Sequence, residues 1–236
     1  MDELRCGHGG AAGAAPMIFS VEWDQRYIEN THLAVWPWSD LVTLVRRYGG
    51  PLGSGMLLEL GCGAGANIPF LKSLGARYFG VDGSPTMVAR LKERFPDLAP
   101  QIAVADFTRA LPFAGQFDLV VDRAAVTHNP SAGIEAALDL ARCAMRTGAH
   151  FVGVDWFSTA FTEYERGEPA EDTYTRRGYS DGPFAGVGRV HFSDLGHLRE
   201  LFSRFELLLV EEKRVQTHVP AGGGQFAAWN LVARKP

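Results

Sequence analysis

Short apolar runs recur along most of the chain, and segments with helical spacing of apolar residues separate them. The runs span residues 56–60, 78–82, 102–106, 117–122 and 150–154. Runs of this kind are typical of buried parallel strands. The helical segments predict helices at 21–29, 39–48, 66–74, 86–95, 131–147 and 193–202. Strands that alternate with helices predict an α/β fold with a mostly parallel sheet.

The end of the chain has a different pattern. Residues 205–215 and 225–233 predict two strands that are joined by a hairpin loop containing Gly222, Gly223 and Gly224. The hairpin adds one antiparallel strand to the sheet. We therefore expect a single domain over residues 17–236. The Gly/Ala-rich residues 1–16 predict a disordered extension, with Met17 as a candidate start.

A glycine loop follows the first predicted strand. Gly61, Gly63 and Gly65 stand at alternate positions directly after an apolar run that contains Glu59. Glycines there permit turn conformations and let a ligand approach the backbone. The helix predicted after the loop directs free N–H groups towards the same place. This pattern predicts a ligand on the loop, and a tight strand-to-helix turn without a ligand is the alternative.

Acidic residues follow the next predicted strands. Asp82 ends the second strand, where a carboxylate is placed to accept hydrogen bonds from both hydroxyls of a ribose. Asp106 ends the third strand beside Phe107, a pair suited to the amine and the ring face of an adenine. Each aspartate alone is equally typical of a turn or a helix cap. A dehydrogenase loop would carry its third glycine at the position of Ala66, so hydride transfer is the less favoured alternative.

These motifs, taken in order, resemble the class I S-adenosylmethionine-dependent methyltransferases. The resemblance rests on residues 59–65, 81–84, 105–107, 111–113 and 117–128, and it extends roughly from Trp23 to the C-terminus. It implies a Rossmann-like sheet of seven strands in the order 3-2-1-4-5-7-6, with helices on both faces. It also implies S-adenosylmethionine as the cofactor, with no metal. The cofactor-binding residues that it indicates are Glu59, Gly61, Cys62, Gly63, Gly65, Asn67, Asp82, Gly83, Asp106, Phe107 and Arg123.

By the same resemblance, the glycine loop holds the methionine and ribose part of the cofactor, and Asp82 holds the ribose hydroxyls. Glu59 and Arg123 then lie near the amino-acid end. The tryptophan-rich segment 23–38 is similar to the leader of small-molecule methyltransferases of the thiopurine and tellurite-resistance type. This similarity implies that Trp23 and Tyr27 cover the cofactor. Packing of these aromatic residues onto the sheet is the alternative.

The long connection 155–192 is rich in aromatic residues, and we interpret it as a substrate lid, with a merely structural flap as the alternative. His128, six residues beyond the fourth strand, is the candidate base for an acceptor that must lose a proton; Asp155 and His191 are reserves. These expectations describe methyl transfer by in-line displacement to a small molecule. A protein methyltransferase and a catalytically silent cofactor-binding module remain alternatives.

Charge and composition argue against nucleic acid and membranes as partners of this chain. A net charge of −4 and a pI near 6.0 give no field that would attract nucleic acid. The 3 cysteines are too few for a disulfide framework, and no apolar stretch reaches the roughly 20 residues of a membrane span. We therefore expect a cytoplasmic enzyme without a membrane partner.

Overall fold

The computed structural model describes residues 22–236. The predicted extension 1–16 and the candidate start Met17 lie outside the described residues. Two helices, α1 (Glu22–Ile28) and α2 (Ser39–Tyr48), precede the sheet. Leu41, Leu44 and Val45 recur at helical spacing on α2, and all three are buried.

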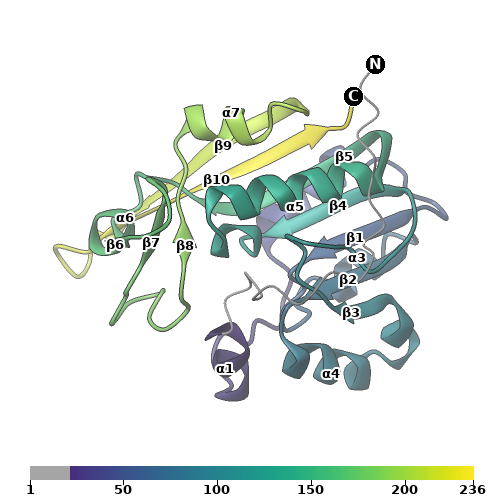
Figure 1. The fold of residues 1–236 in the computed structure, drawn as a ribbon, viewed down its shortest axis with the longest axis horizontal. Helices are drawn as coiled ribbons and strands as arrows, with labels where there is room; N and C mark the ends of the chain where they lie inside the picture. Colours follow the sequence, from purple (N-terminus) through teal and green to yellow (C-terminus); the bar gives the residue numbers. More distant parts are fainter. Residues whose placement is uncertain (1–21) are drawn as a thin grey trace.

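Seven strands form the main sheet in the order β3-β2-β1-β4-β5-β10-β9 (Figure 1). Their bounds are β1 (Met56–Leu60), β2 (Arg77–Asp82), β3 (Ile102–Val104), β4 (Phe117–Arg123), β5 (Met145–Phe157), β9 (Glu206–Gln216) and β10 (Gln225–Arg234). Only β10 pairs antiparallel with its neighbours β5 and β9. The predicted order and the single antiparallel strand are confirmed.

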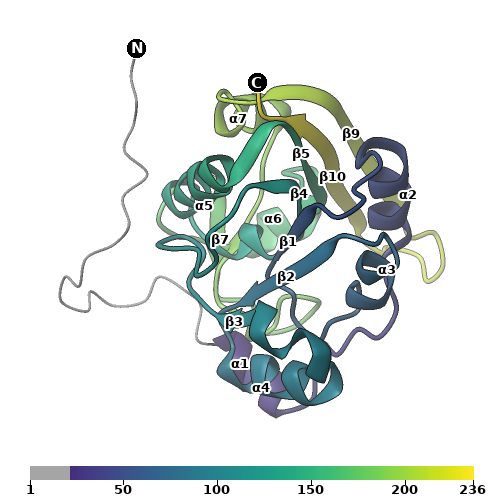
Figure 2. The same ribbon diagram turned by 90° about the vertical axis from the view of Figure 1, so that its right-hand side faces the viewer.

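Helices cover both faces of the sheet (Figure 2). Apolar side chains of α2, α3 (Ile68–Lys72) and α4 (Pro85–Arg94) pack on one face. Those of α5 (Ser131–Ala144) and α7 (Leu195–Leu201) pack on the other. Two short 3-10 helices, η1 (Pro96–Gln101) and η2 (Val126–His128), lie in the connections. The fold is therefore a three-layered, Rossmann-like α/β arrangement.

The sequence misplaced the boundary between α5 and β5. The helix ends at Ala144 instead of near Gly148, and β5 runs from Met145 to Phe157 instead of over 150–154. Met145 leaves the helix early because it is fully buried and pairs with Phe117 of β4. The helix predicted at 66–74 is also shorter, since α3 starts only at Ile68.

The connection that follows β5 is folded. It contains α6 (Glu163–Arg166) and a three-stranded sheet of β6 (Glu168–Pro169), β7 (Thr175–Arg177) and β8 (Val190–His191). The part of this connection beyond β5, residues 158–192, is called the insert below. Its apolar residues pack with Phe157 and Ala227 of the main sheet in a separate cluster. In Figure 1 the insert and α1 both lie beyond the carboxyl ends of the parallel strands.

Candidate functional site

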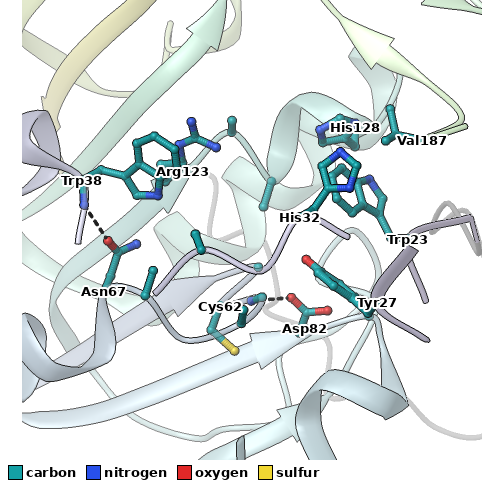
Figure 3. A pocket seen from close by; sticks show the side chains of 18 of the residues that line it. Trp23, Tyr27, His32, Trp38, Cys62, Asn67, Asp82, Arg123, His128 and Val187 are labelled. Carbon is teal, nitrogen blue, oxygen red and sulfur yellow. Dashed lines mark hydrogen bonds between the residues drawn. The ribbon is translucent and has the colours of Figure 1, made fainter. Parts of the chain in front are cut away.

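A cavity of about 570 Å³ lies where the parallel strands end. Its walls come from the loops after β1, β2 and β4, from the segment 23–38, and from the insert. Figure 3 shows Asp82 and Cys62 on one side of it, Arg123 with Trp38 on a second, and Trp23, His32 and His128 on a third. The cavity therefore joins parts of the chain that are far apart in sequence.

The glycine loop is fixed by its backbone. Gly61 has φ of +61°, and a Cβ built there would lie 2.0 Å from the Cβ of Ala125. Only glycine fits this left-handed conformation and close approach. Gly63 donates its N–H to Asp82 Oδ2 at 2.8 Å. The loop is thus held against both the β4 loop and the end of β2.

Asp82 is fixed before any ligand arrives. Its Oδ1 accepts the Ser84 N–H at 2.9 Å while Oδ2 accepts that of Gly63, and the residue is 5% exposed. Burial raises the pKa of Asp82, against the effect of these two N–H groups, which lower it. Each carboxylate oxygen has a second lone pair, so Asp82 still offers acceptors at the cavity wall.

Glu59 is buried near the end of β1 and fixes the residues around the glycine loop. It accepts hydrogen bonds from Asn67 Nδ2 at 2.9 Å and from the Tyr78 hydroxyl at 2.6 Å. Burial raises the pKa of Glu59 to about 7. Asn67 in turn accepts the Trp38 N–H through Oδ1 at 3.3 Å. Glu59 and Asn67 therefore link the segment 23–38 to the glycine loop, and both also line the cavity.

Arg123 belongs to a network of alternating charges. Its Nη2 lies 3.1 Å from Asp155 Oδ2, and its guanidinium lies 3.5 Å from the centre of the Trp38 ring (Figure 3). Lys213 Nζ bridges Asp155 and Asp40 at 2.6 Å each. Burial lowers the pKa of Arg123, although Asp155 works in the opposite direction. The network orients the guanidinium along one wall of the cavity.

His128 is the last residue of η2 and lies across the cavity from Arg123 and Trp38 (Figure 3). Its Nδ1 lies 2.9 Å from the carbonyl oxygen of Arg189, so Nδ1 must carry the proton in that hydrogen bond, and Nε2 keeps a free lone pair. Burial lowers the pKa of His128 to about 4, which keeps the ring uncharged at neutral pH. The ring of Trp23 lies edge-on at 4.7 Å.

Asp122 positions the loop that carries His128. This residue is fully buried, and its Oδ1 accepts the N–H groups of Ala125 and Val126 at 3.1 Å each. Its Oδ2 accepts Trp156 Nε1–H at 2.7 Å. Burial raises the pKa of Asp122 to about 7, whereas the three donors favour its charged form.

Most of the predicted site residues line the cavity together: Trp23, Tyr27, Glu59, Gly61, Cys62, Gly63, Asn67, Asp82, Gly83, Phe107, Arg123 and His128. Gly65 and Asp106 do not line it. Asp106 Oδ1 instead accepts the N–H and the hydroxyl of Thr108. The two reserve bases are also engaged elsewhere, since Asp155 binds two cations and the fully buried His191 contacts Thr175 and His197.

Sequence reasoning missed several lining residues: His32, Leu33, Ala34, Ala124, Ala125, Asn129, Pro183, Val187 and Phe226. His32 to Ala34 lie between tryptophans that the sequence did single out, so the spacing of Trp23 and Trp38 was an available signal. No local pattern marks Val187 or Phe226, which reach the cavity only through the folding of the insert and β10.

Two tests on residues 22–236 concern metals and membranes. None of these residues form a group of three or more His, Cys, Asp or Glu side chains suited to a metal ion. No helix within this range has the length and apolar character needed to cross a bilayer.

Comparisons with known proteins agree with this geometry. Residues 57–148 match the family model described as "Methyltransferase domain". A S-adenosylmethionine-dependent methyltransferase from Methanosarcina mazei has a similar structure, with a TM-score of 0.65 and 18% identity over 85% of this chain and 99% of that one. TehB from Haemophilus influenzae gives a TM-score of 0.56 and 17% identity over 90% and 67% of the two chains.

A third similar structure is the 1,6-didemethyltoxoflavin-N1-methyltransferase of Burkholderia thailandensis, determined with 1,6-didemethyltoxoflavin and S-adenosylhomocysteine bound. Its TM-score is 0.57, and it is 18% identical over 96% of this chain and 93% of that one. No curated protein has a significant sequence match to this chain.

Proposed function

We propose that the chain is a class I S-adenosylmethionine-dependent methyltransferase that transfers a methyl group from this cofactor to a small-molecule acceptor; the methyltransferase-domain match over residues 57–148 and the similar folds support this. One observation carries the proposal. The glycine loop, Asp82 and Arg123 share one cavity with the free Nε2 of His128, so one cavity offers sites for both a cofactor and an acceptor.

The residues present fit the cofactor. Backbone N–H groups of the loop and the second lone pairs of Asp82 suit its ribose and methionine parts. Glu59 and Arg123 offer opposite charges for the amino and carboxylate groups, and Phe107 offers a ring face for the adenine. Trp23 and Tyr27 on α1 complete the cover. Asp106 bonds to Thr108 through Oδ1 alone, so its Oδ2, which lies 3.5 Å from Arg109 Nε, stays the proposed acceptor for the adenine amine.

S-adenosylmethionine supplies an activated methyl group on a sulfonium. A lone pair of the acceptor forms the new bond to the methyl carbon, while the carbon–sulfur bond breaks with its electron pair going to sulfur. The chain mainly aligns the partners and excludes water. When the acceptor atom carries a proton, His128 Nε2 accepts it, since Arg189 holds the other ring nitrogen in its protonated form.

Two parts of the chain have supporting roles in this proposal. The insert acts as the substrate lid, because Phe161, Phe184 and Val187 form one wall of the cavity. Tyr164 and Tyr179 do not line the cavity and pack against the apolar cluster of the insert, whereas Tyr174 stacks on His197 of α7.

Calorimetric titration of the full chain with S-adenosylhomocysteine tests the cofactor assignment. We expect a single site in the wild type and a loss of affinity in Asp82→Ala. The control Asp139→Ala removes an exposed carboxylate that pairs with Arg204 at the surface, and it should bind as the wild type does. No binding by the wild type would refute the proposed function.

The role of His128 is tested by methyl transfer from labelled S-adenosylmethionine into a metabolite extract. Activity should fall with acidification around pH 4, because the base must be unprotonated and its pKa is lowered to about 4. His128→Gln should lose about 10²-fold or more in turnover and also lose this acidic limb. An unchanged turnover and pH profile in His128→Gln would exclude the base role.

A further inference from the structure

The half of the cavity next to His128 is walled by aromatic rings. The aromatic wall consists of Trp23, Phe157, Phe161, Phe184 and Phe226, all of which line the cavity. The rings follow one another in contact: Phe157 lies 4.8 Å from Phe184, Phe184 lies 5.6 Å from Phe161, and Phe161 lies 5.1 Å from Phe226. The four phenylalanines therefore form a continuous surface made by β5, the insert and β10, and Trp23 of α1 packs against the same apolar cluster.

The wall is linked to the candidate base. The His128 ring lies edge-on to Trp23 at 4.7 Å and to Phe157 at 6.2 Å. Its Nε2 is available as an acceptor, since Nδ1 is bonded to the carbonyl oxygen of Arg189. The imidazole of His32, edge-on to Trp23 at 5.3 Å, lines the same side of the cavity. A molecule seated on the wall thus meets ring faces and edges together with imidazole nitrogens that can form hydrogen bonds.

The charged lining residues are already engaged within the protein, and this holds for Arg123, whose charge is felt by His128 and whose guanidinium pairs with Asp155. Glu59, Asp82 and Arg123 stand at β1, β2 and β4, and each has partners within the protein. Figure 3 shows the guanidinium of Arg123 turned to Trp38 and away from Val187. Lys213 lies 5.5 Å from the Phe226 ring, but Asp40 and Asp155 bind its ammonium group. An ionic acceptor on the wall would lose its hydration, and the cations Arg123 and Lys213 are already paired with carboxylates.

We infer that the acceptor is an uncharged, planar aromatic molecule carrying a hydroxyl or N–H group, seated on the aromatic wall with that group towards His128. Flat rings gain offset and edge-to-face contacts that a saturated skeleton of the same size does not. The inference rests on the proposed function, which supplies the cofactor half of the cavity.

Three probes with closely related skeletons test the inference by calorimetry on the full chain saturated with S-adenosylhomocysteine. They are 2-naphthol, its anionic relative 6-hydroxy-2-naphthoate, and the saturated decahydro-2-naphthol. We expect 2-naphthol to bind about tenfold or more tightly than the naphthoate, because the carboxylate would lose its hydration where the nearby cations are already paired. We expect a preference of about threefold to tenfold over the saturated alcohol.

A pair of variants assigns the preference to the wall. Phe184→Leu keeps an apolar side chain but removes a ring, so it should weaken 2-naphthol by about threefold to tenfold and reduce its advantage over the saturated alcohol. The control Tyr164→Leu removes a ring of the insert that packs on Phe192 and does not line the cavity. It should leave the affinity for 2-naphthol within about twofold of the wild type.

The titrations separate two failures. Absence of S-adenosylhomocysteine binding would overturn the proposed function and this inference with it. If that ligand binds but the naphthoate or the saturated alcohol binds as tightly as 2-naphthol, the acceptor class is wrong and the proposed function stands. An equal loss in Phe184→Leu and Tyr164→Leu would likewise show that the wall does not select the acceptor.

Discussion

Gly61→Ala tests whether the glycine loop and the β4 loop form one rigid unit. The added Cβ would lie 2.0 Å from the Cβ of Ala125, far inside van der Waals contact. Ala125 cannot retreat freely, since Asp122 Oδ1 holds its N–H at 3.1 Å. Gly61 also has φ of +61°, a region that alanine disfavours. The substitution therefore combines backbone strain with a steric conflict.

The two effects have different magnitudes. Left-handed strain alone costs about 1 kcal/mol. Overpacking against a fixed neighbour adds about 1–3 kcal/mol, so Gly61→Ala should lower the free energy of unfolding by about 2–4 kcal/mol. Gly148→Ala provides the strain alone, because Gly148 has φ of +79° and no atom of residues 22–236 lies within 4 Å of its added Cβ. It should cost about 1 kcal/mol.

Urea unfolding followed by circular dichroism measures the free energies of unfolding of both variants. Calorimetric titration with S-adenosylhomocysteine measures their affinity for this ligand. Gly61→Ala should weaken binding by about tenfold or more, because the displaced β4 loop carries His128 and adjoins Arg123, whereas Gly148→Ala should not. The double variant Gly61→Ala with Ala125→Gly removes the conflicting methyl group, so it should recover most of the steric cost. Equal destabilisation by Gly61→Ala and Gly148→Ala, or no recovery in the double variant, would refute the reasoning.

Two further predictions concern buried polar groups. Asp122→Asn places an amide N–H opposite Trp156 Nε1–H and should lower the free energy of unfolding by about 1–3 kcal/mol. Adding Trp156→Phe removes the opposing donor and should restore part of that stability. Costs that simply add in urea unfolding of the double variant would contradict the prediction. Burial lowers the pKa of both His191 and His197, whose Nε2 atoms lie 3.1 Å apart. The unfolded chain therefore binds more protons below about pH 6.5, and their contribution to stability is lost as the pH falls. His191→Gln should reduce the slope of unfolding free energy against pH by up to about 1.4 kcal/mol per pH unit between pH 6.5 and 4; an unchanged slope would count against this.

The sequence by itself determined the architecture and the location of the site. Apolar runs fix strands locally, and polar residues after each run must meet at one edge once the strands are parallel, so Asp82 and Arg123 were predictable without coordinates. The glycine loop was equally predictable, because a backbone with positive φ strongly favours glycine. The end of α5 was not predictable from the sequence, because the pairing of Met145 with Phe117 of β4 outweighed the helical pattern.

Only the tertiary structure decided where side chains point and what they bind. Asp106 lies at the predicted edge but turns to Thr108, and His128 acquires its tautomer from the carbonyl oxygen of Arg189, 61 residues away. The aromatic wall likewise joins Trp23 to Phe226 through an insert whose fold no local pattern describes. The physical reason is that hydrogen bonds and ring contacts between distant residues depend on how the whole chain closes, whereas periodicity records only each segment's own burial.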